Sequence, residues 1–219
     1  MIEVRNVTKS YLIVTGGRYF VFRDLNLTIE SGLNVALLGR NGEGKSTLLR
    51  LLAGQEKPDK GEIICSKTIS WPIGLQSVFQ GSLTGRQNVK FVARVHGVDQ
   101  AHIREIVRYV EDFAEIGPHF DMPTRTYSTG MRGRVAFGLS LAFDFDYYLI
   151  DEALSVGDTH FRQKASAALK EKISSGNIIL ATHAMPQVKQ MCDIVLLIKD
   201  GAIERFDDIN AGIRAYEES

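Results

Sequence analysis

One short stretch of the chain has both the residue types and the spacing of a phosphate-binding loop. It consists of Gly39, Arg40, Asn41, Gly42, Glu43, Gly44, Lys45, Ser46 and Thr47. This order fits the pattern G-x-x-x-x-G-K-S/T, in which the glycines let successive backbone N–H groups face one anion. Lys45 would reach the β- and γ-phosphates, and the Ser46 hydroxyl would bind Mg²⁺. The stretch therefore predicts a site for a nucleoside triphosphate.

The flanking residues supply the elements that such a loop requires. Residues 33–38 are a short apolar run of strand character, and residues 48–52 are helix formers without Pro or Gly. A strand, a glycine loop and a helix in this order place the positive end of the helix dipole at the phosphates. The alternative, a glycine-rich turn that fits the pattern by chance, does not explain these flanks.

Two acids and a histidine follow apolar runs further along the chain. Asp151 and Glu152 end the run that starts at Tyr147. In such a pair the first carboxylate can hold Mg²⁺ and the second can polarise the attacking water. His183 directly follows the run 178–182, from where it could contact the γ-phosphate and keep the water in line. Alone, each is also compatible with an ordinary loop position.

Two further positions are ambiguous by themselves. Tyr11 follows the first predicted strand, where its ring could stack on a purine or simply pack. Ser128 and Gly130 lie in a Ser/Thr/Gly turn before a predicted helix, where Ser128 could be only an N-cap.

The rest of the chain alternates strand and helix patterns. Strands are expected within residues 2–4, 21–29, 61–65, 68–71, 147–152, 178–182, 194–198 and 202–206, the last two joined by a turn at Asp200-Gly201. Apolar residues follow helical spacing between residues 103 and 114, and a helix is expected at 161–175. We therefore expect one domain over residues 1–219, with a helical insert at about 84–140. Its fold class is α/β, with a mainly parallel sheet covered on both faces.

The charge balance, the cysteines and the lengths of the apolar runs indicate which partners and which cellular compartment to expect. Lys+Arg and Asp+Glu number 26 each, so the overall charge gives no support for nucleic acid as the main partner. Cys65 and Cys192 lack metal-ligand spacing and are expected to be reduced thiols. We expect no signal peptide, and no apolar run reaches the roughly 18 residues that a membrane span needs.

Taken in order, these motifs resemble those of ABC ATPases over essentially the whole chain. The matching positions are Tyr11 for the adenine-stacking aromatic, Gly39–Thr47 for the Walker A loop, Ser128 and Gly130 for the signature motif, Asp151 and Glu152 for the Walker B acids, Val156-Gly157-Asp158 for the D-loop and His183 for the switch histidine. The resemblance implies a P-loop ATPase core with an antiparallel β subdomain and a helical subdomain. It also implies that ATP and Mg²⁺ bind between two head-to-tail copies. Lys45 and Glu152 of one copy would then face Ser128 of the other.

The variants of these motifs resemble the polysaccharide-export branch of that family, and within it the capsular polysaccharide exporter ATPases. The stretches that carry this likeness are residues 68–72, 79–94, 127–132, 145–148 and 155–158. The likeness implies a peripheral subunit at the cytoplasmic face of the inner membrane, bound to a membrane permease. Through that permease it would connect to periplasmic and outer-membrane components. O-antigen or teichoic acid export, a soluble ABC ATPase and a P-loop kinase or GTPase are the alternatives.

Three positions depart from the usual ABC pattern. Glu43 stands where a small residue is usual, and a carboxylate facing phosphates would repel them. Met131 replaces the signature glutamine and cannot make its hydrogen bonds. The Q-loop glutamine, which would contact the nucleotide and Mg²⁺, corresponds to Gln76 by spacing or to Gln80 by the exporter likeness.

Overall fold

The computed structural model describes residues 1–14, 16–74, 79–151, 158–173 and 176–219. The chain forms two compact units. The first comprises Met1–Pro72, Phe145–Glu152 and Ile173–Ser219, and the second comprises Ile73–Asp144 and Ala153–Lys172. Each unit has its own packed interior and is described by itself.

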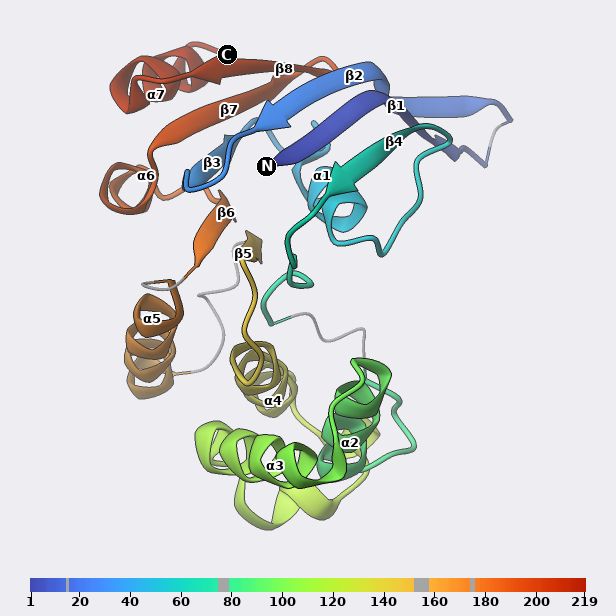
Figure 1. Cartoon of the computed structure of the whole chain (residues 1–219), viewed down its shortest axis with the longest axis vertical. Helices are drawn as coiled ribbons and strands as arrows, with labels where there is room; N and C mark the ends of the chain where they lie inside the picture. The colour runs from blue at the N-terminus through green and yellow to red at the C-terminus, as the bar shows by residue number, and fades with distance from the viewer. Residues whose placement is uncertain (15, 75–78, 152–157, 174–175) are drawn as a thin grey trace. The chain divides into compact units, whose positions relative to one another are not determined.

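The first unit contains two sheets (Figure 1). The antiparallel sheet has the order β2-β1-β4, formed by β1 (Ile2–Leu12), β2 (Arg18–Ile29) and β4 (Lys60–Cys65). The other sheet has the order β5-β6-β3-β7-β8, formed by β5 (Tyr147–Asp151), β6 (Asn177–Ala181), β3 (Val35–Leu38), β7 (Ile194–Lys199) and β8 (Ala202–Phe206). Its first four strands are parallel and β8 is antiparallel. The predicted fold class is confirmed, since the unit has both the mainly parallel sheet and the separate antiparallel sheet.

Both sheets of this unit share one apolar core with α1 (Lys45–Leu52). The helix contributes Leu48, Leu49, Leu51 and Leu52. All four residues of β3 are buried, as expected for a central parallel strand covered on both faces. Because β3 leads directly into the phosphate loop, the core holds both ends of that loop in place.

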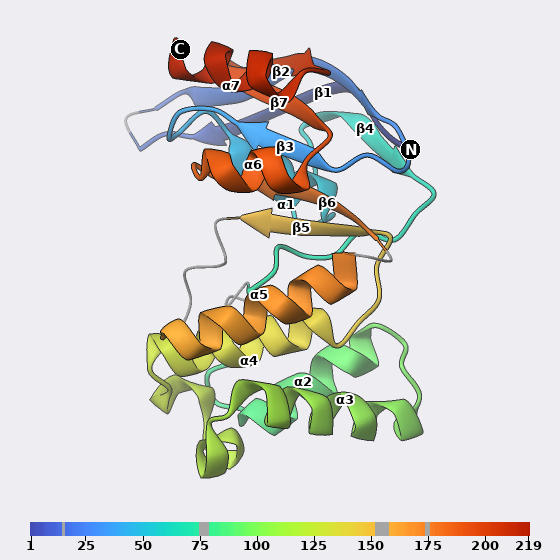
Figure 2. The same cartoon turned by 90° about the vertical axis from the view of Figure 1, so that its left-hand side faces the viewer.

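Two helices of the first unit were not predicted, namely α6 (Met185–Met191) and α7 (Ile209–Glu217). Figures 1 and 2 show α7 lying along the end of the parallel sheet that carries β7 and β8. A Cβ added at Gly212 would lie 2.6 Å from the Cβ of Val195, so the glycine permits a close approach of α7 to β7. Ile213 is buried beside it.

The expected strand at residues 68–71 is reduced to a single parallel bridge between Ile69 and Tyr147. Two backbone hydrogen bonds, from the Ser70 N–H to the Tyr147 oxygen at 2.9 Å and from the Tyr147 N–H to the Thr68 oxygen at 3.0 Å, are flanked by side-chain hydrogen bonds. Ser70 Oγ accepts the N–H of Leu149 at 2.9 Å, and Thr68 donates both its N–H and its hydroxyl to Asp146 at 2.8 Å. These contacts fix the start of β5, the strand that ends at Asp151.

The second unit is helical. It contains α2 (Gly85–Val95), α3 (Gln100–Ala114), the short 3₁₀ turns η2 (Gly117–Asp121) and η3 (Thr124–Thr126), α4 (Thr129–Leu141) and α5 (Thr159–Ile173). Figure 2 shows α3, α4 and α5 running alongside one another. Phe113 of α3 stacks on Phe137 of α4 at 6.1 Å between ring centroids, and it meets Phe161 of α5 edge-on at 5.5 Å. This aromatic cluster holds α4, the helix that follows the Ser128 turn.

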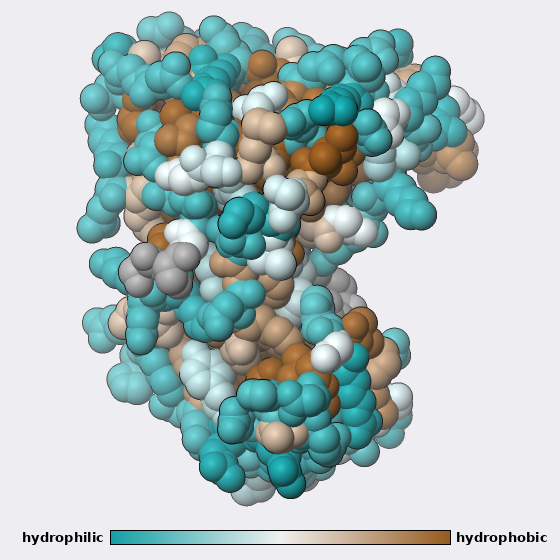
Figure 3. Space-filling model, viewed as in Figure 1, coloured by the Kyte–Doolittle hydropathy of each residue, from teal (hydrophilic) through white to brown (hydrophobic). Residues whose placement is uncertain are grey.

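Exposed apolar side chains gather at the tip of the β1–β2 hairpin. Leu12, Ile13 and Val14 are all exposed there, and Figure 3 shows the tip as a brown projection at the right. Among the residues that the structure describes, no helix combines the length and apolar composition needed to cross a bilayer.

Candidate functional site

The phosphate loop, the first turn of α1 and the end of β5 surround a pocket of about 220 Å³. Its lining consists of Asn41, Gly42, Gly44, Lys45, Ser46, Thr47 and Asp151. The structure thus brings most of the predicted Walker A residues together with the first Walker B acid. Ser46 and Asp151, two of the predicted Mg²⁺ ligands, line this pocket together.

Two glycines determine how the loop packs. Gly44 is the N-cap of α1 and has φ +106°, in the left-handed region. A Cβ there would lie 2.5 Å from Cγ1 of Val21 on β2, and a Cβ at Gly39 would lie 2.7 Å from the backbone oxygen of Ile198 on β7. Gly44 has no side chain to cap the helix, so the N–H groups of the first turn remain suited to an anionic ligand.

Lys45 lies across the loop that it belongs to. Its side chain is buried, at 8% exposure, and Nζ donates to the backbone oxygens of Gly39 at 2.6 Å and Arg40 at 3.1 Å. The ammonium therefore supports the curl of the loop from inside. It also provides a positive charge at the pocket, as a phosphate site requires.

Outside the pocket lining, Glu43 and Arg40 of the loop point to other elements. The Glu43 carboxylate accepts the backbone N–H of Asp200 at 2.8 Å, in the turn between β7 and β8. Arg40 Nη1 donates to the backbone oxygen of Ser219 at 3.4 Å, just beyond α7. The acid that departs from the usual Walker A pattern is thus used as a hydrogen-bond acceptor for a turn.

His183 lies directly beside the phosphate loop, and its role as a switch histidine stays a prediction. Its Nε2 is 3.1 Å from Oδ1 of Asn41, and its Nδ1 is 2.7 Å from the hydroxyl of Tyr216 on α7. Sequence reasoning missed Tyr216. The residues around Tyr216 have the pattern of an amphipathic helix over 209–217. Such a pattern can predict the helix, but it does not indicate a side-chain partner 33 residues away.

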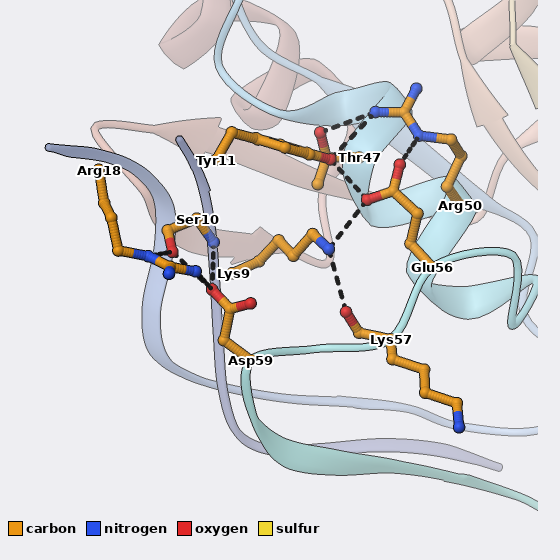
Figure 4. Close-up of polar contacts among 9 residues, drawn as sticks. All are labelled: Lys9, Ser10, Tyr11, Arg18, Thr47, Arg50, Glu56, Lys57 and Asp59. Atoms are coloured by element: carbon orange, nitrogen blue, oxygen red, sulfur yellow. Dashed lines mark hydrogen bonds and ion pairs between the residues drawn. The ribbon is translucent and has the colours of Figure 1, made fainter. Parts of the chain in front are cut away.

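Tyr11 belongs to a polar network that reaches the phosphate loop (Figure 4). Its hydroxyl donates to Glu56 at 2.6 Å, and Arg50 of α1 donates to Glu56 at 2.6 Å, to the Tyr11 hydroxyl at 3.3 Å and to Thr47 Oγ1 at 3.2 Å. Lys9 adds an ion pair to Glu56 at 3.1 Å. Partial burial raises the pKa of Glu56, but hydrogen bonds from Tyr11, Lys9 and Arg50 outweigh it and hold that pKa below its usual value. The predicted adenine-stacking ring is thereby linked to Thr47 of the loop.

The residues that could hold a metal ion are hard oxygen donors. A Ser46 hydroxyl and an Asp151 carboxylate on one pocket suit Mg²⁺, which binds through few protein oxygens and keeps water and phosphate ligands. Glu152 and Gln76 lie outside the described residues. Gln80 lies in the second unit, where its backbone N–H donates to Oδ1 of buried Asn88 at 2.8 Å. The roles of Glu152 and of both glutamines stay predictions.

The turn that contains Ser128 and Gly130, which resembles the signature motif, lines another pocket in the second unit. This pocket has a volume of about 590 Å³. Ser128 Oγ accepts the N–H of Met131 at 3.1 Å, so Ser128 is the N-cap of α4. Arg134 of α4 pairs with Asp158 at 2.6 Å, and a hydrogen bond from the Phe161 N–H, with help from Arg134, lowers the pKa of Asp158. Ser128, Gly130, Met131, Arg134 and Asp158 line this pocket together. Residues 155–157 of the expected D-loop lie outside the described ranges.

Comparison with known proteins agrees with this geometry. A family model described as "ABC transporter" matches residues 22–155. The chain is 49% identical over 218 residues to the polysialic acid transport ATP-binding protein KpsT of Escherichia coli, covering 99% of this chain and 96% of KpsT. It is 42% identical over 217 residues to the capsule polysaccharide export ATP-binding protein CtrD of Neisseria meningitidis serogroup B, covering 99% and 97% of the two chains.

A solved dimeric structure of the ATP-binding cassette MJ0796, bound to ADP and Pi, has the same fold. Its TM-score is 0.75 at 23% identity, with 94% of this chain and 97% of that chain covered. The predicted resemblance to ATPases of the capsular polysaccharide-export branch is confirmed by the two full-length relatives. The family model spans the phosphate loop and Asp151, which line one pocket in the structure. The chain belongs to the ABC transporter family.

Proposed function

We propose that this chain binds and hydrolyses ATP to power the export of a capsular polysaccharide. The observation that carries this proposal is the full-length similarity to KpsT and CtrD, whose names assign them to polysialic acid transport and capsule polysaccharide export. The pocket formed by the phosphate loop and Asp151 supports the ATPase part. We expect the subunit to act at the cytoplasmic face of the inner membrane with a membrane permease, and through it with periplasmic and outer-membrane components.

At the phosphates, each group of this chain has a chemical task. The N–H groups at the start of α1 and the Lys45 ammonium bind the negative charge of the β- and γ-phosphates. Ser46 and Asp151, with Gln76 or Gln80, would hold Mg²⁺, which when bound neutralises charge on the phosphate oxygens. Glu152 would accept the proton of the attacking water, and His183 would keep that water and the γ-phosphate aligned.

The complete site is proposed to need two copies of the chain. Ser128 lies at the N-terminus of α4, and Ser128 and Gly130 border an open pocket. A helix N-terminus of this kind suits the phosphate of a nucleotide bound by a second copy. The solved cassette with the same fold is a dimer, which supports the same arrangement.

The first test is ATP hydrolysis by the purified chain, with Glu152→Gln beside it. We expect slow turnover in the unchanged chain, loss of turnover in the variant, and an ATP-dependent dimer that light scattering detects only for the variant. A variant that hydrolyses ATP and stays monomeric at saturating ATP would overturn both the role of Glu152 and the two-copy site.

The second test addresses export in the organism that carries the gene. Deletion should abolish surface polysaccharide, measured by staining for anionic polymer, while polymer accumulates inside the cells. The unchanged gene should restore the surface polymer, and a Lys45→Ala allele expressed at the same level should not. If capsule persists while O-antigen or teichoic acid disappears from the surface, the exported polymer has been assigned wrongly.

A further inference from the structure

We propose that Tyr216 is a positioning residue for ATP hydrolysis, because its hydroxyl holds the ring of His183 toward the phosphate loop. This inference rests on the proposed ATPase function. It assigns a part in that site to α7, a helix that contributes nothing to the pocket around Lys45 and Asp151.

The hydrogen-bond partners of His183 match the tautomer that carries its hydrogen on Nε2. Oδ1 of Asn41 can only accept, so Nε2, 3.1 Å away, is the donor. In the neutral ring Nδ1 is then the acceptor, and the Tyr216 hydroxyl donates to it at 2.7 Å. This tautomer presents an N–H to the loop that would hold the phosphates, and the Tyr216 hydroxyl bonds the other ring nitrogen.

The ring of His183 is exposed, so neighbouring side chains must hold its orientation. The rings of His183 and Tyr216 are tilted by 40° with centroids 6.1 Å apart, and their closest polar contact is the hydroxyl on Nδ1. When ATP occupies the loop, the Nε2 hydrogen would exchange Asn41 for a phosphate oxygen. The bond from Tyr216 would remain through that exchange and keep the ring in place.

α7 itself is fixed firmly enough to serve as a reference point. Asp208 caps its first turn by accepting the N–H groups of Asn210 and Ala211 at 2.7 and 3.2 Å. Gly212 allows the close contact with Val195 of β7, and Ile213 is buried at 5% exposure. Because β7 also pairs with β3, α7 and the phosphate loop are held by the same sheet.

The test compares Tyr216→Phe with Tyr109→Phe, which removes a tyrosine hydroxyl from α3 in the other unit. A neutral hydrogen bond is worth about 1 kcal/mol, so kcat for ATP should fall about fivefold in Tyr216→Phe, while the Kd for ATP stays within about twofold. Tyr109→Phe should match the unchanged chain in both quantities. Wild-type kcat in Tyr216→Phe, or an equal loss in Tyr109→Phe, would overturn the proposal.

A second readout does not depend on turnover. Nitrogen-15 NMR of the histidine rings should show His183 as the Nε2–H tautomer in the unchanged chain, and a shifted Nδ1 resonance in Tyr216→Phe. His183→Ala identifies the resonance. If the unchanged chain hydrolyses no ATP but the His183 resonance responds to Tyr216→Phe, the proposed function fails and the contact stands. If ATP is hydrolysed and neither kcat nor the resonance changes, the positioning role alone is wrong.

Discussion

The carboxylate of Glu43 accepts the backbone N–H of Asp200 at 2.8 Å, which joins the phosphate loop to the turn between β7 and β8. Asp200 has φ +51°, a left-handed conformation that a non-glycine residue adopts at some cost. An acceptor at its N–H helps to hold that turn. The contact also answers the electrostatic objection to an acid at this position, because the side chain is directed to a backbone donor of the turn.

Replacing Glu43 should therefore affect stability more than nucleotide binding. Glu43→Ala removes the acceptor and should lower the free energy of unfolding by about 1 kcal/mol in urea denaturation. Glu43→Gln keeps an acceptor oxygen and should stay close to the unchanged chain. The Kd for ATP, measured by calorimetry, should change less than about twofold in both variants. Clearly tighter ATP binding in Glu43→Ala would mean that the carboxylate faces the phosphates after all.

Tyr11 should contribute to ATP binding through its ring and to stability through its hydroxyl. Tyr11→Ala removes an aromatic contact worth about 1 kcal/mol and should weaken ATP binding about fivefold. Tyr11→Phe keeps the ring but loses the bond to Glu56, so it should lower stability with little change in Kd. Calorimetry in a Glu152→Gln background separates binding from turnover. Equal Kd values for the two variants would count against the stacking role.

Lys45 should be irreplaceable by another cation. Lys45→Ala should reduce ATP hydrolysis by about 100-fold or more. The substitution removes the positive charge that would stabilise the negative charge developing on the phosphate oxygens in the transition state. Lys45→Arg should not restore activity, because a planar guanidinium cannot occupy the buried position 2.6 Å from the Gly39 oxygen. The readout is phosphate release, with circular dichroism to verify folding. Near-normal turnover in Lys45→Arg would show that hydrolysis does not require the Lys45 ammonium in this position.

Asp146 should make the first unit sensitive to acid. The Thr68 N–H, the Thr68 hydroxyl and Lys67 lower its pKa to about 2, from 3.8. Because the folded pKa is depressed, ionised Asp146 contributes its full stabilisation above pH 3.8 and loses it as pH falls toward 2. Asp146→Asn should thus lower the free energy of unfolding at pH 7, and its deficit should shrink below about pH 4.

The control for this experiment is Asp144→Asn. The Asp144 side chain is 88% exposed and pairs with Lys172, and an exposed pair of this kind contributes little. Urea midpoints measured between pH 7 and pH 3 should therefore separate the two aspartates. A deficit in Asp146→Asn that stays constant over this range would show that ionisation of Asp146 does not contribute.

Local patterns were sufficient for the parts of the site that a single strand–loop–helix segment forms. The phosphate loop and the β7–β8 turn follow from glycine positions and apolar runs, and the structure has them where they were expected. The strand expected at residues 68–71 is limited to one bridge with Tyr147, and side-chain bonds of Thr68 and Ser70 to Asp146 and Leu149 flank it. Propensity does not distinguish these two ways of satisfying polar groups.

Contacts between distant segments were beyond the reach of the sequence. Nothing near Tyr216 indicates a histidine partner, and nothing near Glu43 indicates that its carboxylate would meet a turn 157 residues later. In both cases a short loop side chain and a remote element are brought together by the packing of the parallel sheet. Such pairs depend on the whole tertiary fold, and local sequence patterns do not specify which distant side chains will meet.

The contact between Arg40 and the backbone oxygen of Ser219 has a practical consequence for preparing the protein. A segment fused after Ser219 would begin next to the carbonyl oxygen that accepts from the Arg40 guanidinium at 3.4 Å, and four residues beyond Tyr216. An affinity tag joined there would alter the surroundings of Arg40 in the phosphate loop. Kinetic constants measured on such a preparation would include an effect of the tag. A purification tag should therefore be placed before Met1.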